Sequence, residues 1–433
     1  EDTAILDHIF PQYGPRDWTD DRIDDTLDEI FRSGPEHIQG AVSANMVSEF
    51  DLRLDQIHYD TTSVSMWGTC DPAAGQPAVV ITFGYSKDHR PDLRQIVVGT
   101  AVTGDGGVPL ISGIHDGNTS DSVLPVSYWE RLRQTAGTSS FCFIGDSEIA
   151  SEETLAEICG QDGQFLAPLP MTEPEQKRLI AKLDENELKF VPADPENAEK
   201  PKPVYEKRTD RPGNRRRKEK KPEKPDRYEI CEETRPITDS RGREHTLRKL
   251  VIRSGRLARL HAGTRERRLR KAEAEFRRLR GKLNKYKLTT REAVESAVSG
   301  ILTGCRVRGL INADITEHTE ILRKQTGRGR PGPNTRYTEE RKVIFDISVC
   351  RQHPKIEEKA LLDGIFLMVS NHDPGQWPAP DLLALYKRQY KVERAFRTLK
   401  SPLAVSPVLL EKPDRICAMM FVMTLALQLY TLI

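Results

Sequence analysis

The chain is short of cysteine and has no paired cysteine motif. Its seven cysteines are odd in number and scattered, and none stands in a C-x-x-C sequence. This pattern argues against a zinc ribbon and a disulfide framework and predicts a reducing, cytoplasmic environment. The first residues, EDTAILDHIFPQYG, are acidic and lack the basic and apolar regions of a signal peptide, so we expect no export.

An excess of one charge sign is also missing. Lys and Arg number 66 and Asp and Glu 65, which gives a formal net charge of +1. Whole-chain charge therefore points to no partner, and the charges have to be examined region by region. The segment from 200 to 228, KPKPVYEKRTDRPGNRRRKEKKPEKPDR, is rich in proline and charge and predicts a solvated linker. A later stretch, RLARLHAGTRERRLRKAEAEFRRLRGKLNKY, predicts a long basic helix.

Only one apolar run, ICAMMFVMTLALQLYTLI at 416 to 433, is long enough to span a bilayer. Thr424 and Gln428 interrupt it and no basic or aromatic flank follows, so we expect a buried core helix and no membrane partner. Because the chain starts without methionine and stops within this run, we also expect the natural protein to be longer.

The first half of the chain predicts a sheet with helices packed on it. Residues 16 to 50 predict short helices, and three strands follow from about residue 54. These strands, LDQIHYDTTSVSMWG, PAVVITFGYS and RQIVVGTAV, are separated by Gly, Pro and Asp, which predicts an antiparallel meander. A helix through VSYWERLRQ, a strand FCFIGD, a helix SEETLAEICG and a strand QFLAPLP come next. The order β, β, β, α, β, α, β is typical of an α/β fold.

Residues 171 to 360 break this order and predict a large basic α+β insertion. YEICEE, HTLRKLVIR and VIFDISVCR have strand character around the basic helix, and DGIFLMVSN follows them as a further strand. After Pro378 and Pro380, Asp381 can cap one helix, LLALYKRQYKVERAFRTLK. The insertion therefore separates two parts of one fold, at 51 to 170 and at 361 to 433.

Three carboxylates stand at positions that ask for an explanation. Asp60 interrupts an apolar, β-branched strand, and Asp146 closes the apolar run FCFIG. Glu393 lies on the late helix, with Tyr386 seven residues before it and Lys400 seven after it, on one stripe. Each also has an ordinary interpretation: an outward-facing strand residue, the cap of a turn, and a surface helix with charge pairs. The residue types alone leave these alternatives open.

A resemblance carried by five segments in order favours the functional interpretation. YDTTSV, FGYSKDHRPDLRQIVVGTAVTGDGGVPL, HDGNTSD, FIGDSEIAS and YKRQYKVERAFRTLK resemble the DDE transposases of bacterial insertion sequences. They are similar to the branch whose late helix carries a Tyr-x2-Arg-x3-Glu-x6-Lys signature. The similarity covers roughly residues 16 to 170 and 340 to 430. It implies a ribonuclease H-like mixed sheet flanked by helices, with the basic insertion ahead of the last catalytic helix.

The resemblance also implies a metal-dependent chemistry. Asp60, Asp146 and Glu393 would hold two Mg²⁺ or Mn²⁺ ions, because hard cations prefer carboxylate oxygens. Such a pair of ions makes a nucleophile from water and stabilises the leaving oxyanion of a phosphodiester. Cleavage at transposon ends and strand transfer into target DNA would follow, with the chain working as a homodimer in a bacterial cytoplasm, at the nucleoid. Residues 1 to 50 would belong to a DNA-binding region.

One position departs from the signature. Tyr386, Glu393 and Lys400 match it, but Gln389 stands where the signature has Arg, with Arg388 just before it. Gln cannot make the charged fork of an Arg to a phosphate, so either Arg388 takes that contact or the contact is weaker. We expect Tyr386, Arg388, Arg397 and Lys400 to contact the DNA backbone, and packing or solvation is the other explanation for them.

Two other functions remain open from the sequence. The chain could be a DNA-binding relative without cleavage, or a nuclease of similar fold that does not rejoin strands. The histidines His58, His89 and His115 have no metal-ligand spacing to any Cys, so we expect them in polar core or loop roles.

Overall fold

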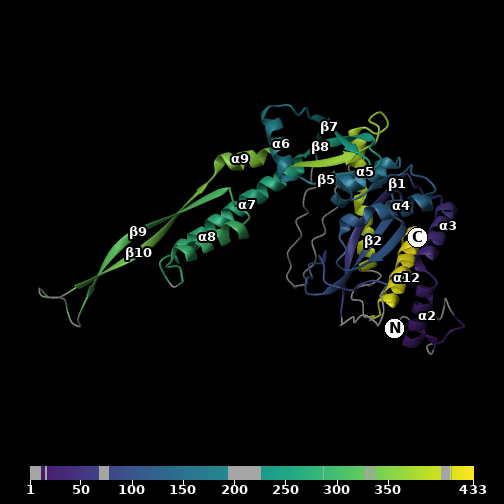
Figure 1. Ribbon diagram of the computed structural model, residues 1–433, viewed down its shortest axis with the longest axis horizontal. Coiled ribbons are helices and arrows are strands. Elements are labelled where there is room, and N and C mark those ends of the chain that lie inside the picture. Colours follow the sequence, from purple (N-terminus) through teal and green to yellow (C-terminus); the bar gives the residue numbers. More distant parts are fainter. Residues whose placement is uncertain are drawn as a thin grey trace, which may run out of the picture.

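The computed structural model describes residues 11–14, 17–67, 78–193, 226–285, 287–326, 330, 332, 337–400, 410 and 412–433. Its body is a nine-stranded mixed sheet, in the order β3-β2-β1-β4-β5-β11-β8-β7-β6, with helices on both faces (Figure 1). The strands are β1 Gln56–Met66, β2 Arg94–Thr103, β3 Pro109–His115, β4 Cys142–Ile144, β5 Gln164–Leu169, β6 Val191–Ala193, β7 Tyr228–Thr238, β8 Glu244–Ser254 and β11 Ile365–Ser370. The α/β class predicted from the sequence is confirmed.

Helices cover both faces of this sheet and divide its core in two. In β1, alternation turns Ile57 and Tyr59 toward α4 and α5, and Val64 and Met66 toward α11 and α12. The sheet is therefore buried on both sides where the candidate carboxylates lie. The helices and 3-10 turns of the body are α2 Asp20–Arg32, α3 Pro35–Glu49, α4 Pro125–Ala136, η2 Asp121–Val123, η3 Ser147–Ala150, α5 Glu152–Gly160, α6 Glu173–Asp184, α10 Ala379–Tyr386, η4 Lys387–Gln389, α11 Tyr390–Lys400 and α12 Pro413–Leu432.

The antiparallel meander is present, but one of its strands was predicted in the wrong place. Residues 77 to 86 were expected to form a strand, and among the described residues 78 to 86 only Thr82 makes a bridge, to Gln95. The third strand is β3. Since β2 already pairs with β1 and β3 on its two edges, the segment can reach it only at Gln95, beyond the end of the β3 pairing. Residues 84 to 93 are thus left to form a loop beside β1.

The apolar C-terminal run forms α12, the single described helix long and apolar enough to cross a membrane by length and composition. It packs against the body, where Ile416, Met420 and Leu427 are buried. The Gln428 amide donates hydrogen bonds to Ser43 Oγ at 3.1 Å and to the Pro109 carbonyl at 2.8 Å. These contacts agree with the expected core helix, because they pair the amide nitrogen of the residue that interrupts the run with two buried acceptors.

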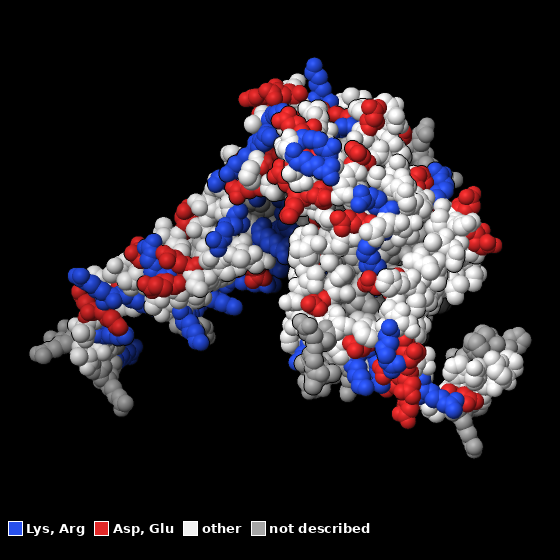
Figure 2. Space-filling view, turned by 45° about the vertical axis from the view of Figure 1, so that its right-hand side comes forward, with Lys and Arg blue, Asp and Glu red and all other residues white. Residues whose placement is uncertain are grey.

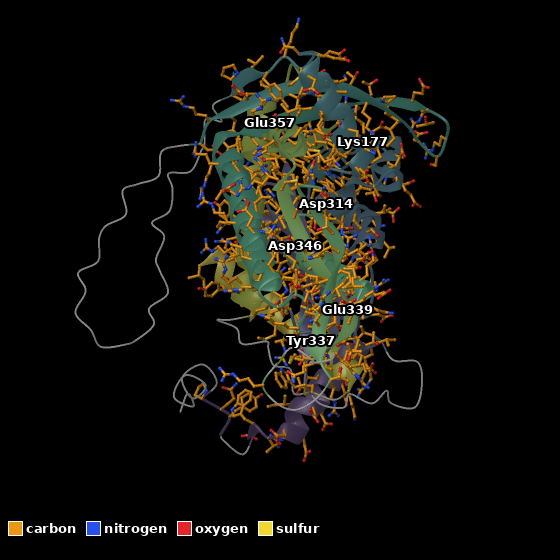
Figure 3. The ribbon with its side chains drawn as sticks, turned by 90° about the vertical axis from the view of Figure 1, so that its left-hand side faces the viewer. Lys177, Asp314, Tyr337, Glu339, Asp346 and Glu357 are labelled. Atoms are coloured by element: carbon orange, nitrogen blue, oxygen red, sulfur yellow. The ribbon has the colours of Figure 1, made fainter. Side chains whose placement is uncertain are left out.

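The described residues between 255 and 361, here called the arm, project from the body (Figure 1). The arm consists of α7 Gly255–Arg280, α8 Arg291–Gly304, the hairpin strands β9 Ile311–Gln325 and β10 Tyr337–Arg351, and α9 His353–Leu361. It has its own apolar core, which includes Leu269, Phe276, Val294 and Ile347. In Figure 3, which faces the arm, the labelled Asp314, Tyr337, Glu339 and Asp346 follow the hairpin, while Glu357 lies on α9 and Lys177 on α6.

The arm is smaller than the insertion expected between residues 171 and 360. The strands β7 and β8 fall within that range, yet β8 pairs with β11 in the main sheet and β7 pairs with β8. The linker expected at 200 to 228 lies almost wholly outside the described residues. At the base of the arm, Arg265 donates two hydrogen bonds of 2.6 and 2.7 Å to Asp363, which joins α7 to the turn before β11.

Candidate active site

The strand register brings Asp60 and Asp146 to the same level of the sheet. β1 and β4 are parallel neighbours, with Ile57 opposite Phe143 and His58 opposite Ile144. Asp60 lies two residues beyond His58, and Asp146 two residues beyond Ile144. Two carboxylates that are 86 positions apart in the sequence, from 60 to 146, are therefore brought near each other where β4 ends beside β1.

Asp146 serves the local backbone as well as the carboxylate pair. Its Oδ1 accepts a hydrogen bond of 2.9 Å from the Glu148 N–H and caps η3, so the expected capping role is present. The cap fixes the side chain at the end of β4, where it remains close enough to Asp60 to raise the pKa of that residue. Capping and a role in a site are thus not alternatives here.

A lysine on the loop beside β1 lies next to Asp60 and Asp121. The Lys87 ammonium lies 3.8 Å from Asp60 Oδ1 and 2.9 Å from Asp121 Oδ2. It also donates to the Thr61 carbonyl at 2.8 Å and to Thr61 Oγ1 at 2.7 Å. Asp121, at the start of η2, is therefore a third acidic residue of this cluster.

The carboxylates of this cluster are incompletely neutralised. Burial raises the pKa of Asp60 to about 6, against the lowering effect of Lys87, and Asp146 and Asp121 raise it further. Burial also raises the pKa of Asp146, in spite of the hydrogen bond from Glu148 N–H and the charge of Lys87. The Glu148 carboxyl has a raised pKa for the same reason, burial first and Asp146 second. One ammonium among four carboxylates leaves an excess of negative charge, which is the environment that a cation would enter.

The late helix is broken, not continuous as the sequence predicted. α10 ends at Tyr386, η4 covers Lys387–Gln389, and α11 starts at Tyr390. Gln389 explains the break, because it ties the turn to β1. Its Oε1 accepts from His58 Nδ1 at 2.9 Å, and its Nε2 donates to the Tyr59 carbonyl at 2.9 Å. Burial lowers the pKa of His58 to about 4, so this histidine is a neutral donor that orients Gln389.

Gln389 is therefore a structural clamp in this chain. Gln389 stands where the signature has Arg, and its side chain contacts β1, the strand that carries Asp60. Arg388, the substitute considered from the sequence, is half-buried, and its Nη1 lies 3.4 Å from Gln56 Oε1 at the start of β1.

Glu393 lies on the exposed side of α11, while Val392 and Phe396 pack the helix onto β1 and β2. No described residue forms a hydrogen bond or ion pair with its carboxylate. Tyr386 connects it to the carboxylate pair: burial raises the pKa of Tyr386, and Asp146, Glu393 and Asp60 raise it further. All three carboxylates of the predicted triad thus raise the pKa of the same hydroxyl, that of Tyr386.

The remaining residues expected to contact DNA have different surroundings. Arg397 is exposed on α11. Lys400 donates to both oxygens of Asp88, at 2.8 and 3.0 Å, and so binds α11 to the loop that carries Lys87. Tyr386 is half-buried.

The described residues contain no group of three His, Cys, Asp or Glu side chains close enough to hold a metal ion. Asp60 and Asp146 lie together, whereas Glu393 lies on the neighbouring helix. Lys87, Asp121 and Glu148 were not among the site residues predicted from the sequence. All three stand in segments that carry the resemblance, SKDH, NTSD and GDSE, which is the signal that could have identified them.

A family model decides the class of this chain. The model described as "Transposase DDE domain" matches residues 60 to 429, which spans most of the sequence and includes all the carboxylates above. The chain belongs to the DDE transposases. No curated protein matches the sequence. For a DDE transposase, DNA is the implied partner, and dependence on a divalent metal is a general property of the family.

Proposed function

We propose that this DDE transposase is of the insertion-sequence type with the Tyr-Arg-Glu-Lys signature, and that it cleaves transposon ends and joins them to target DNA. The observation that carries the proposal is the carboxylate pair of Asp60, on β1, and Asp146, just beyond the end of the parallel strand β4, which is short of positive charge. The strand order β3-β2-β1-β4-β5, antiparallel for the first three strands and parallel afterwards, supports a ribonuclease H-like domain. Residues 51 to 170 and 361 to 433 would form it.

Asp60, Asp146 and Glu393 would hold two Mg²⁺ or Mn²⁺ ions. Their oxygens suit hard cations, and the raised pKa values of the two aspartates show how poorly their charge is compensated without one. Bound ions would supply an activated water and stabilisation of the leaving oxyanion. Glu393 has no hydrogen bond or ion pair with a described residue that would have to be broken before it joins Asp60 and Asp146.

The other residues would position the DNA backbone. Arg397 and Lys400 offer charge on the face of α11 that also carries Glu393, and Tyr386 and Arg388 border the same turn. Phosphate contacts of this kind fix the register of the duplex. Figure 2 shows a wide notch between the arm and the body, with Lys and Arg side chains gathered at its inner end, which favours phosphate binding there.

Synapsis of two ends would require a homodimer.

Cleavage of a duplex that carries the element's ends, by the full chain with Mn²⁺, tests this proposal. We expect nicking by the wild-type chain and strand-transfer products on longer incubation. Asp146→Asn should abolish nicking and retain DNA binding. Nicking without joined products would instead indicate a nuclease, and DNA binding without metal-dependent nicking would indicate a non-catalytic relative.

A further inference from the structure

The Lys87 ammonium is held more firmly than a surface lysine. Its three protons meet the Thr61 carbonyl, Thr61 Oγ1 and Asp121 Oδ2, all between 2.7 and 2.9 Å, which uses every donor that the group has. Its side chain is 29% exposed, and Asp60 Oδ1 lies 3.8 Å away. The positive charge is therefore fixed beside the carboxylates that the proposed function assigns to a metal.

The loop that carries Lys87 is attached on both sides of the site. The Lys87 N–H donates to Ser63 Oγ on β1 at 2.8 Å. Its neighbour Asp88 accepts from Lys400 on α11. The backbone turns sharply at the next residue, His89, which has a φ of 58°, and its N–H donates to the Ser86 carbonyl at 3.2 Å. The turn thus delivers the ammonium to the strand of Asp60, beside Asp121 of η2.

We propose that Lys87 is the resident counter-ion of Asp60 and Asp121, and that a divalent cation must displace its ammonium to bind Asp60. The inference rests on the proposed function for the identity of the site. The Lys87 ammonium lies 3.8 Å from Asp60 Oδ1, so a metal ion bound to that oxygen would stand close to it, and the repulsion between the two cations moves the Lys87 side chain away. Lys87 is a positioning residue in this scheme: it keeps the carboxylates together before the metal arrives.

Metal affinity of the full chain tests the competition. Mn²⁺ titrated into the protein, with free Mn²⁺ read by electron paramagnetic resonance, should bind Lys87→Met about 10-fold more tightly than wild type. Lys87→Arg keeps the charge and should show no gain. Lys182→Met is the matched control, because Lys182 is also partly exposed and bound to a carboxylate, Glu233, at 2.7 Å. Equal affinity of wild type and Lys87→Met would overturn the proposal.

A second readout needs no substitution. Acylation of lysines in the wild-type chain, followed by mass spectrometry, should find Lys87 protected without metal and several-fold more reactive with saturating Mn²⁺. Lys182 should react equally in both conditions. Lys87 protection that does not change with Mn²⁺ would overturn the proposal even if Lys87→Met fails to fold.

The two levels of the proposal fail separately. If the wild-type chain cleaves DNA while Lys87 stays protected in Mn²⁺, the counter-ion role is wrong and the transposase assignment stands. If Mn²⁺ releases Lys87 but cleavage survives Asp146→Asn, the cation site exists and the assigned chemistry is wrong.

Discussion

Two carboxylate clusters of the body differ in how their charge is compensated. At the candidate active site, Lys87 is the one cation within 4.0 Å of Asp60 or Asp121 among the described residues. On β7, by contrast, Glu233 accepts from Arg178 at 2.6 and 2.9 Å and from Lys182 at 2.7 Å.

The second cluster is here called the Glu233 network. It also contains Glu175, which accepts from Arg178 at 2.7 Å and from Lys249 at 2.5 Å. Hydrogen bonds from Arg178 lower the pKa of Glu233 to about 2. The pKa of Glu175 falls as well: burial alone would raise it, but the bonds from Arg178 and Lys249 outweigh burial.

The contrast separates a structural use of buried charge from a functional one. In the Glu233 network three cations match two carboxylates, so the charged forms are already stable and need no ligand. At the candidate site the carboxylates outnumber the cation, and burial raises the pKa values of Asp60 and Asp146, so their charged forms are costly without a further cation. Four predictions test this distinction.

The largest difference is expected in DNA cleavage. Asp60→Asn should reduce Mn²⁺-dependent nicking by about 1,000-fold or more, because the substitution removes an oxygen ligand with its charge. Glu233→Gln should change the nicking rate by less than about threefold when compared at a temperature where both variants are folded. Gel assays under single-turnover conditions would measure both. Comparable losses in the two variants would erase the distinction between the clusters.

The second prediction concerns the free energy of unfolding, which Glu233→Gln should lower and Asp60→Asn should raise. Glu233→Gln removes the hydrogen-bonded charged partner of Lys182 and one of the two carboxylate partners of Arg178, and we expect it to lower the free energy of unfolding by about 2 kcal/mol. Asp60→Asn should raise that free energy by about 1 to 2 kcal/mol, since it removes a carboxylate that is costly to ionise. Urea unfolding near neutral pH measures both. A destabilised Asp60→Asn would show that Asp60 is a structural ion.

The third prediction is that these two stability differences fade in different pH ranges. Asp60 has a raised folded pKa of about 6, so its ionisation destabilises the fold above that pH. The lost stability returns as pH falls toward the unfolded pKa of 3.8. The advantage of Asp60→Asn should therefore vanish between about pH 7 and pH 4. Glu233 has a lowered folded pKa of about 2, so its stabilisation is complete above 4.5 and is lost only as pH falls toward 2. Unfolding curves at several pH values would show two separate transitions, and a shared pH range would contradict the assignment.

The smallest effect is expected at the clamp beside the site. Gln389→Ala removes the hydrogen bonds to His58 and the Tyr59 carbonyl, and the joint between α10 and α11 should loosen. We expect about a 10-fold slower nicking rate and a smaller loss of DNA affinity, because the loosened joint displaces Glu393 from the carboxylates and moves only part of the proposed DNA contacts with it. Asn284→Ala, which loses two similar bonds to Phe345 in the arm, is the control. A larger loss of DNA affinity than of rate would place Gln389 at the DNA.

Much of the sheet could be predicted from local patterns. β1, β4 and β5 follow apolar runs, and the family resemblance located Asp60 and Asp146. The segment from 77 to 86 was mistaken for a strand because its apolar residues satisfy the strand pattern. Val79 and Ile81 are indeed buried, but against the helices that cover β2. The spacing of apolar residues alone does not distinguish a paired strand from a buried loop.

The pairing of distant segments could not be predicted. β8 and β11 pair across at least 112 positions, from Arg253 to Ile365, and no local signal shows that β7 and β8 extend the main sheet. The broken helix at 387 to 389 has the same origin, since Gln389 is held by His58 on another element. Lys87 was missed because a lysine in a loop is ordinarily solvated, and only the fold shows that it points into the carboxylates.

The location of Mn²⁺ in a crystal of the full chain with a cleaved transposon end addresses the central assignment most directly. We predict two anomalous peaks about 3.5 to 4 Å apart, which the carboxylates of Asp60, Asp146 and Glu393 would hold. Lys87 should have left the pair. Peaks elsewhere, or a metal-free cluster with Lys87 still between Asp60 and Asp121 in the presence of DNA and Mn²⁺, would contradict the two-metal assignment.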